Sequence, residues 1–299
     1  MSQQAPDGPA HRAGVVALLG RPNAGKSTLL NRLLGEKLAI VTAKPQTTRS
    51  RLLGILHRPE AQLLLVDTPG FLEGGRPLEA AMRAVAEEAA RDCDVALLLV
   101  DAVRGWEPPH AEWLTRLAGR GTPVLLVATQ CDRPGAERAP WPPPGTEAAA
   151  GAARTSARTG EGLEALLEQV VALLPEAPVF YPDDELTDRP MRFLAAEAVR
   201  EAAFEVLGQE LPYRIAVEVT DFEESDPRLV RIRATILVER DSQKRIVVGR
   251  GGAQIKEIGI RARREIERLV GRQVHLALWV KIEPGWARKP KRLKSLGYC

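Results

Sequence analysis

The chain has 299 residues with a formal net charge of +3, and 44% of its residues are hydrophobic, which is typical of a globular protein with about two domains. No run approaches the roughly 20 apolar residues of a membrane span. Met1 to Arg12 lack the apolar core of a signal peptide, so we expect a cytoplasmic protein with a flexible tail at residues 1–12. The three cysteines and four histidines are scattered, and their spacing predicts neither disulfides nor a metal site.

The first predicted element is a buried strand over residues 15–19, which leads through a glycine-rich loop into a helix over residues 26–34. The loop contains a glycine, four residues and then Gly-Lys-Ser, which is the spacing of a phosphate-binding loop. In such a loop backbone N–H groups surround the phosphates, Lys26 reaches the outer two, and the Ser27 hydroxyl ligates magnesium. The predicted nucleotide-binding residues are Gly20, Arg21, Pro22, Asn23, Ala24, Gly25, Lys26, Ser27 and Thr28.

The following elements alternate between strands and helices, as in a parallel sheet covered by helices. Strands are predicted at 63–66, 95–100 and 124–127, helices at 77–92, 107–118 and 162–174, and an antiparallel edge strand at 52–56. The low-complexity run 140–153 predicts a flexible insertion. We therefore expect an α/β domain over residues 13–175, followed by an acidic, proline-rich linker over residues 176–190.

Two polar segments of this domain have the composition of nucleotide-responsive switches. Asp67, Thr68, Pro69 and Gly70 end a strand, so Asp67 can hold magnesium through water and the Gly70 N–H can contact the terminal phosphate. Thr47 and Thr48 lie in a polar loop, and one of them can close onto magnesium when that phosphate is bound. The predicted metal ligands are Ser27, Thr48 and Asp67. Phe71 follows Gly70, and its apolar ring cannot orient an attacking water.

The second predicted domain, residues 191–299, has a different pattern and a strong positive charge. Helices are predicted at 191–208 and 256–270, and strands at 216–220, 231–238 and 274–282, which indicates a small α+β unit. Residues 228–299 carry about 19 Lys and Arg against about 6 Asp and Glu. This asymmetry indicates a polyanionic partner.

A Gly-x-x-Gly loop between two helical stretches of this domain is the signature of a KH module. Its glycines let the backbone approach nucleic-acid phosphates, and the apolar groove beside it takes unstacked bases. The residues predicted to bind RNA are Lys244, Arg245, Gly249, Arg250, Gly251, Gly252 and Lys256. Trp279 and Trp286 are candidates for stacking on bases, while a core position is an equal alternative for Trp279.

These motifs resemble those of the Era family of GTPases over nearly the whole chain. The phosphate loop resembles the family's Gly-Arg-Pro-Asn-x-Gly-Lys-Ser, and Pro45-Gln46-Thr47-Thr48-Arg49 matches its switch. The resemblance implies a Ras-like P-loop GTPase domain followed by a type II KH domain, with GTP or GDP and Mg²⁺ as cofactors. It also implies that Thr48 is the switch threonine, that Asn23 holds K⁺ against the phosphates, and that GTP hydrolysis is slow.

The chain departs from the family in base recognition, where Asn-Lys-x-Asp is replaced by Thr129-Gln130-Cys131-Asp132. The Asp132 carboxylate can still accept two hydrogen bonds from guanine, and adenine offers no equivalent donors. Thr129 does not mimic an asparagine amide, and the Gln130 side chain is shorter than the family's lysine and uncharged, so it covers the base less well. Losing hydrogen bonds of about 1–3 kcal/mol each predicts nucleotide binding weakened roughly ten- to thousandfold. Ser156 and Ala157 match the loop that backs the base, although the strand before them has poor β-propensity.

The resemblance implies a monomeric GTPase switch that binds the single-stranded 3′ end of small-subunit ribosomal RNA and acts in small-subunit assembly. The residues alone predict only binding of single-stranded RNA. Two alternatives remain: an RNA chaperone with a degenerate nucleotide site, and an NTPase with relaxed base choice. The basic segment 288–292 also leaves open a peripheral contact with anionic lipid at the inner face of the cell membrane.

Overall fold

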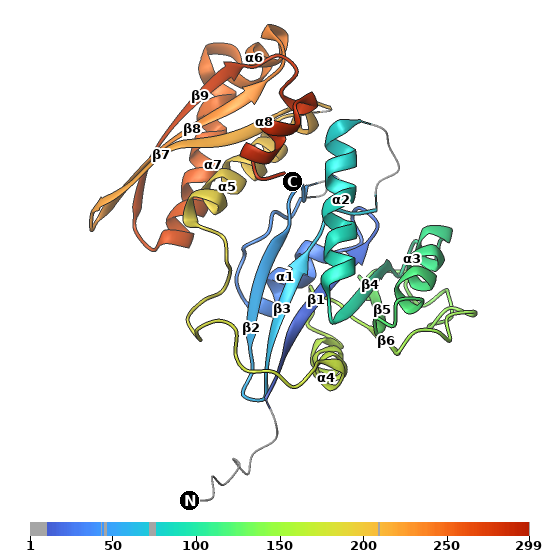
Figure 1. Cartoon of the computed structure of the whole chain (residues 1–299). Helices are drawn as coiled ribbons and strands as arrows, with labels where there is room; N and C mark the ends of the chain where they lie inside the picture. The colour runs from blue at the N-terminus through green and yellow to red at the C-terminus, as the bar shows by residue number, and fades with distance from the viewer. Residues whose placement is uncertain (1–10, 43, 45–46, 72–75, 209, 299) are drawn as a thin grey trace, which may run out of the picture. The chain divides into compact units, whose positions relative to one another are not determined.

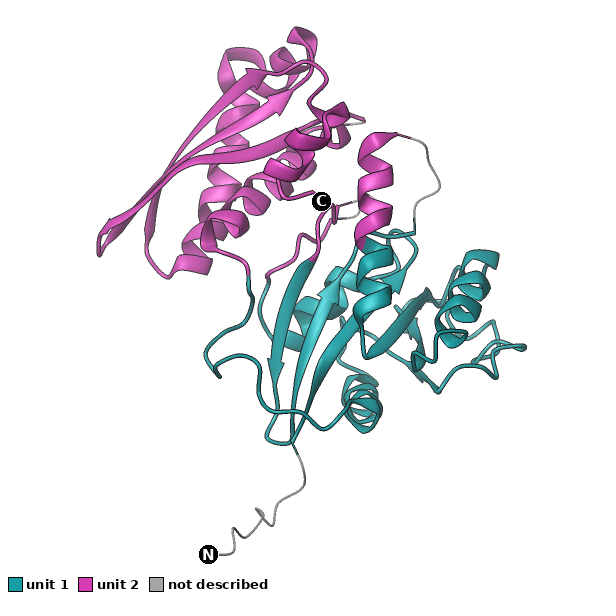
Figure 2. Cartoon of the chain, in the orientation of Figure 1, with its two compact units in different colours: residues 1–37, 52–71, 86–188 teal, residues 38–51, 72–85, 189–299 magenta. Residues whose placement is uncertain are grey.

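The computed structural model describes residues 11–42, 44, 47–71, 76–208 and 210–298 (Figure 1). The chain forms two compact units, one of residues 1–37, 52–71 and 86–188 and the other of residues 38–51, 72–85 and 189–299 (Figure 2). Two short segments of the first expected domain, 38–51 and 72–85, thus group with the second unit. Of the expected tail, residues 1–10 lie outside the described residues, whereas Arg12 already begins the first strand.

The first unit is built on a six-stranded sheet in the order β2-β3-β1-β4-β5-β6. All neighbouring strands are parallel except β2 and β3, which form the predicted antiparallel edge. Every residue of β3, β4 and β5 is buried, as expected for strands of a parallel sheet that is covered on both faces. The strands are β1 (Arg12–Gly20), β2 (Leu52–His57), β3 (Ala61–Asp67), β4 (Val95–Asp101), β5 (Val124–Thr129) and β6 (Gly151–Arg154).

The helices of this part of the chain agree with the sequence predictions to within a residue or two. They are α1 (Lys26–Leu34), α2 (Pro77–Asp92), α3 (Pro108–Ala118) and α4 (Leu163–Leu173). Because β1, β3, β4 and β5 are parallel, the loops at their carboxyl ends meet at one edge of the sheet. That edge is where the predicted nucleotide-binding residues of the first unit gather.

The prediction of a flexible insertion over residues 140–153 is wrong at its end, because Gly151–Arg154 form β6, the strand of poor β-propensity expected before Ser156. This strand pairs in parallel with β5, with Ala152 opposite Leu126 and Arg154 opposite Ala128. The pairing continues into the next residue, whose backbone N–H donates to Ala128 O at 2.7 Å. Hydrogen bonding to a buried neighbour outweighs the poor β-propensity of this Ala- and Gly-rich run.

The second unit packs helices against one face of a three-stranded sheet in the order β7-β8-β9. Strands β7 and β8 are antiparallel, and β8 and β9 are parallel. Alternate residues of β8, including Val230, Ile232 and Ile236, share a core with Ala198 of α5 and Ile258 of α7. The elements are α5 (Met191–Val206), η1 (Leu211–Arg214), β7 (Ala216–Asp226), β8 (Leu229–Val238), α6 (Asp241–Val248), η2 (Arg250–Gly252), α7 (Ala253–Val270), β9 (Gln273–Ile282), η3 (Trp286–Arg288) and α8 (Pro290–Ser295).

The structure corrects the interpretation of Trp286 and decides between the two alternatives for Trp279. Trp286 is completely buried in a small cluster with Leu237, Leu293 and Tyr298, so its ring is not available to stack on a base. Trp279 is 52% exposed, which excludes a core position. It alternates along β9 with residues that pack inwards, and therefore faces away from the helices.

The basic segment 288–292 is folded. Its residues span the end of η3 and the start of α8, and Arg292 forms ion pairs with Glu218 at 2.8 Å and Glu283 at 3.0 Å. These two carboxylates raise the pKa of Arg292. In the described part of the chain, no helix combines the length and apolar character needed to cross a bilayer.

Candidate functional site

The loop between β1 and α1 adopts the conformation that a phosphate cradle requires. Asn23 and Gly25 have φ angles of 63° and 85°, a left-handed conformation that asparagine and glycine tolerate better than other residues. The Lys26 ammonium donates to Gly20 O at 3.1 Å and Arg21 O at 2.9 Å, so the lysine folds back over the loop. Burial lowers the pKa of Lys26 to about 8, against an opposing effect of the Asp67 charge.

The two predicted magnesium ligands of this unit lie side by side. The Ser27 hydroxyl donates to Asp67 Oδ2 at 2.6 Å, and Asp67 is completely buried at the end of β3. A hydroxyl and a carboxylate oxygen are hard ligands, which suit Mg²⁺. The donor set therefore fits this ion.

The segment after β3 packs tightly on the phosphate loop. The Thr68 hydroxyl donates to Leu18 O at 2.7 Å, and the Phe71 N–H donates to Gly20 O at 3.0 Å. A Cβ atom on Gly70 would lie 2.5 Å from the Pro22 nitrogen, so only glycine fits there. Phe71 stacks on Trp113 of α3, with ring centroids 4.5 Å apart and planes 7° from parallel. Its ring is part of an aromatic contact and supplies no polar group to a water.

Thr129 and Gln130, which replace the family's Asn-Lys, both contact the phosphate loop. The Thr129 hydroxyl lies 2.8 Å from Ala24 O and 3.1 Å from Val100 O. Gln130 Nε2 donates to Asn23 O and to Asp101 Oδ2, both at 3.1 Å. The motif predicts these side chains only as partners of the base, and their role as braces between β5 and the loop depends on contacts with residues about 100 positions away.

Asp132 is held in place by two donors. Ser156 Oγ donates to Asp132 Oδ1 and Arg158 Nε to Asp132 Oδ2, both at 2.6 Å. These hydrogen bonds lower the pKa of Asp132, which keeps the carboxylate ionised. Ala157 lies between the two donors in the loop after β6. Sequence reasoning missed Arg158, because nothing in the local pattern distinguishes it from a surface arginine.

The threonines of the predicted switch belong to a different compact unit from the phosphate loop. Thr47 and Thr48 belong to the second unit, whereas the phosphate loop and Asp67 belong to the first. Arg49, the next residue, is buried and bonded within the second unit. Pro45 and Gln46 of the predicted motif, and the loop glycines 74 and 75, lie outside the described residues.

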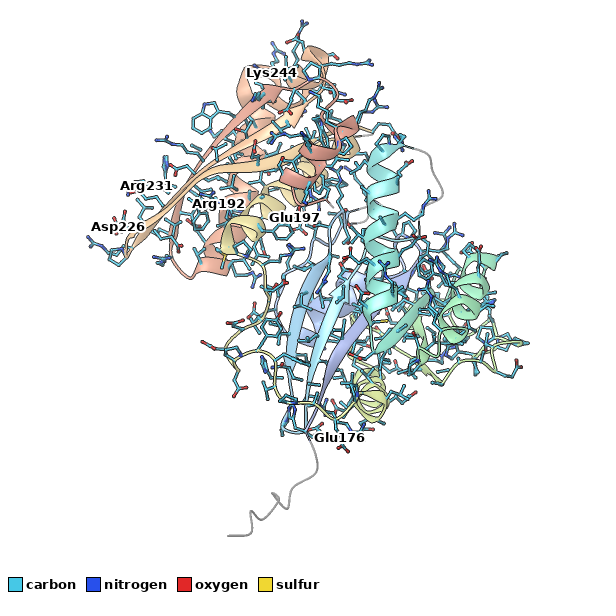
Figure 3. The ribbon with its side chains drawn as sticks, in the orientation of Figure 1. Glu176, Arg192, Glu197, Asp226, Arg231 and Lys244 are labelled. Carbon is cyan, nitrogen blue, oxygen red and sulfur yellow. The ribbon has the colours of Figure 1, made fainter. Side chains whose placement is uncertain are left out.

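The Gly-x-x-Gly loop lies between α6 and α7, as predicted. Gly249, Gly251 and Gly252 have φ angles of 73°, 60° and 79°. A Cβ atom on Gly251 or Gly252 would meet nothing within 4 Å, so the loop presents open backbone. Arg250 and Lys256 are exposed, whereas Arg245 is paired with Asp241 at 2.6 Å. Figure 3 places Lys244 of α6 at one end of this unit and Asp226 of the β7–β8 hairpin at the other.

Comparison with known proteins relates both units to described families. Residues 15–130 match the family of 50S ribosome-binding GTPases, and residues 210–287 match the KH domain. The chain is 46% identical to GTPase Era of Stenotrophomonas maltophilia over 303 residues, covering 100% of both chains, and 44% identical to GTPase Era of Geobacter metallireducens, covering 96% and 98%.

Two solved structures are similar over nearly the whole chain. A complex of Era with MgGDPNP and nucleotides 1506–1542 of 16S ribosomal RNA has a TM-score of 0.88 at 36% identity, covering 97% of this chain and 99% of that one. An Aquifex aeolicus Era variant bound to GDP and AlF4⁻ has the same TM-score and identity, covering 96% and 99%. The sequence differences at residues 129 and 130 therefore occur within a largely preserved fold.

Proposed function

The chain belongs to the Era family of GTPases, and on that premise we propose a GTP-dependent switch that binds the 3′ end of small-subunit ribosomal RNA during small-subunit assembly. The observation that carries the proposal is the phosphate loop with Lys26 folded over it and Ser27 bonded to Asp67, in the same chain as an open Gly-x-x-Gly loop. The similar Era structure with MgGDPNP and 16S ribosomal RNA supports both ligands. The division into domains at 13–175 and 191–299, with a linker between, remains part of this proposal.

In this proposal the predicted site residues contact different parts of the nucleotide. Backbone N–H groups of residues 20–28, apart from Pro22, and the Lys26 ammonium would bind the phosphates, and Asn23 would hold K⁺ against them. Ser27, Asp67 and, in the GTP state, Thr48 would hold Mg²⁺, which neutralises phosphate charge when bound. Asp132 accepts from guanine, and the donors Ser156 and Arg158 hold its carboxylate in one orientation.

GTP hydrolysis in this chain would rely on backbone groups and bound ions that position the phosphates, rather than on a side chain that orients the attacking water. No side chain at position 71 can orient a water, because that residue is a phenylalanine stacked on Trp113. Thr68 and Phe71 are bonded to Leu18 O and Gly20 O, which supports the Gly70 N–H between them as a donor to a terminal phosphate. We expect a low turnover rate, since Phe71 supplies no group that orients a water.

The second unit supplies the RNA contacts. The backbone of residues 249–252 and the cations Lys244, Arg250 and Lys256 would bind phosphates, and Trp279 offers a free aromatic face. The exposed cations Lys289 and Lys291 also support a peripheral contact with anionic lipid, which sedimentation with phosphatidylglycerol vesicles tests directly.

Binding of fluorescent GDP in a buffer with Mg²⁺ and K⁺, with unlabelled GTP or ATP as competitor, tests the nucleotide site. We expect GTP to displace the probe and ATP to leave it bound. Displacement by ATP would establish relaxed base choice, and no binding would leave RNA binding as the primary activity. Lys26→Ala is the control that removes the phosphate contact.

A further inference from the structure

The segment 38–51, which contains the predicted switch threonines, is attached to the second unit at several points. The Val41 N–H donates to Glu201 Oε1 at 3.0 Å. The Lys44 ammonium donates to Leu207 O at 2.6 Å and also to Phe204 O. These carbonyls lie at the C-terminal end of α5, where backbone oxygens lack helical partners and the helix dipole favours a cation.

Arg49 makes the deepest of these attachments. It is 2% exposed, and its guanidinium donates to Ile215 O at 2.6 Å and Pro212 O at 3.0 Å. It also lies over two rings, with Cζ 5.8 Å from the centroid of Phe204 and 5.6 Å from that of Tyr298. A planar fork that bonds two carbonyls and contacts two rings is a geometry that arginine can satisfy and lysine cannot.

The surroundings of Arg49 contain partners from distant parts of the chain. Burial lowers the pKa of Arg49, an effect that Tyr298 opposes and the nearby Arg200 reinforces. Arg200 is itself paired with Glu197 at 2.5 Å. Thus α5, η1 and the penultimate residue of the chain all meet at this one side chain.

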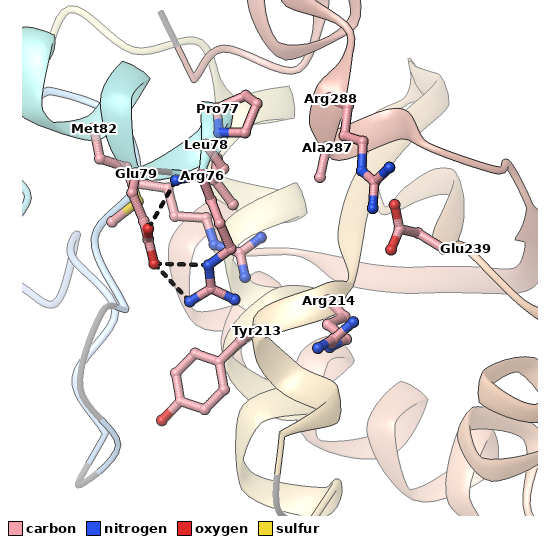
Figure 4. Close-up of a pocket in the computed structure, with 11 residues that line it drawn as sticks. Arg76, Pro77, Leu78, Glu79, Met82, Tyr213, Arg214, Glu239, Ala287 and Arg288 are labelled. Carbon is pink, nitrogen blue, oxygen red and sulfur yellow. Dashed lines mark hydrogen bonds and ion pairs between the residues drawn. The ribbon is translucent and has the colours of Figure 1, made fainter. Parts of the chain in front are cut away.

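The start of α2 lies at the same place in the second unit. Arg49 lines a cavity of about 260 Å³ together with residues at the start of α2. There Arg76 Nε donates to Glu79 Oε1 at 2.9 Å and its backbone N–H to Glu79 Oε2 at 3.2 Å, as Figure 4 shows. Residues that follow Asp67–Gly70 thus share a cavity wall with Arg49 in the second unit.

We propose that Arg49 is a positioning residue that couples the nucleotide state of Thr48 to the RNA-binding unit. This inference rests on the proposed function, in which Thr48 moves when GTP binds. Thr48 and Arg49 are consecutive, so their Cα atoms stay about 3.8 Å apart. Thr48 cannot move by several ångströms unless the residues around Arg49 follow or the guanidinium leaves its partners. The second route is costly, because a buried charge would lose two hydrogen bonds.

The test measures the affinity of a single-stranded RNA oligonucleotide with the 3′-terminal sequence of small-subunit ribosomal RNA, once with GDP and once with a non-hydrolysable GTP analogue. Coupling predicts that the two affinities of the unaltered protein differ by roughly 5-fold or more. Arg49→Lys and Arg49→Ala should bring this ratio to about 1, because Thr48 then moves without the second unit. Arg51→Ala removes an exposed arginine two residues away and should leave the ratio unchanged.

Two further measurements distinguish coupling from a role of Arg49 in stability alone. Loss of stability alone would lower the midpoint of urea unfolding while leaving the affinity ratio intact, which would overturn the proposal. Tyr298→Leu removes one ring from Arg49 without altering segment 38–51, and it should lower the ratio in the same direction. If the unaltered protein binds both nucleotides and RNA but its ratio is already 1, the switch part of the proposed function fails. If Arg49→Lys and Arg49→Ala both keep the affinity ratio of the unaltered protein, Arg49 is not the coupling residue.

Discussion

The Thr129 hydroxyl lies 2.8 Å from the carbonyl oxygen of Ala24, so the end of β5 is bonded to the phosphate loop through a side chain that differs from the family's asparagine. Thr129 is 5% exposed, and Val100 O of β4 lies 3.1 Å from the same hydroxyl, whose single proton is shared between the two carbonyl oxygens. This position therefore joins two strands and the loop. Its contribution is to hold the loop in shape, whichever base is bound.

Replacing Thr129 with valine should weaken nucleotide binding. The substitution keeps the shape of the side chain but leaves Ala24 O without this donor, at a cost of about 1–3 kcal/mol, or roughly 5- to 150-fold in Kd. Titration with fluorescent GDP measures the change. Thr129→Ser retains the hydroxyl and should bind close to the unaltered protein. Equal affinities for the valine and serine variants would contradict the bracing role.

Guanine selection should depend on Asp132 and persist at mildly acidic pH. The lowered pKa of Asp132 means that its charge is present above the ordinary aspartate range and is lost only as pH falls through the depressed value. The preference for GDP over ADP should therefore stay constant from about pH 8 to about pH 5. Arg158→Ala removes one donor, so the preference should begin to fall at a higher pH. A competition assay at several pH values decides this, and a preference that falls near neutral pH would refute it.

The open loop should bind RNA through phosphate contacts. Arg250→Ala removes an exposed cation beside Gly251 and should lower RNA affinity at low salt. It should also reduce the slope of log K against log salt concentration by about 0.7, the value for one phosphate of a single strand. Arg228→Ala is the matched control, because Arg228 is also exposed and its backbone N–H donates to Asp226, which Figure 3 places at the opposite end of the unit from Lys244. An equal loss in both variants would indicate a nonspecific charge effect.

Substitutions of Trp279 and Trp286 should have different effects: one should affect RNA binding and the other the stability of the fold. Trp279→Ala removes an exposed ring and should cost about 1–3 kcal/mol of RNA binding if a base stacks on it. The unfolding free energy should change little. Trp286→Ala creates a cavity in a buried cluster and should lower the free energy of unfolding by about 3–5 kcal/mol. Urea unfolding and RNA titration of both variants test the contrast, and an unchanged RNA affinity for Trp279→Ala would exclude stacking there.

Local patterns predicted the elements of the fold well because the strands of the first unit are buried on both faces and its helices are amphipathic. They failed where contacts are non-local. Residues 151–154 became a strand because β5 lies beside them, and Trp286 is buried because residues from α8 and the chain's end cover it. The sequence also marked Arg49 only as part of a motif, since its partners lie more than 160 residues away.

The close approach of Gly70 to Pro22 limits what mutation can do at this point of the chain. Every other amino acid would add a Cβ atom 2.5 Å from the Pro22 nitrogen and 2.8 Å from its Cα. The segment would have to move away, which would break the Phe71 N–H bond to Gly20 O and tilt the Phe71 ring off Trp113. Position 70 therefore accepts only glycine. A substitution there would impair nucleotide binding and would also weaken the packing of α3, because Trp113 of α3 would lose its contact with Phe71.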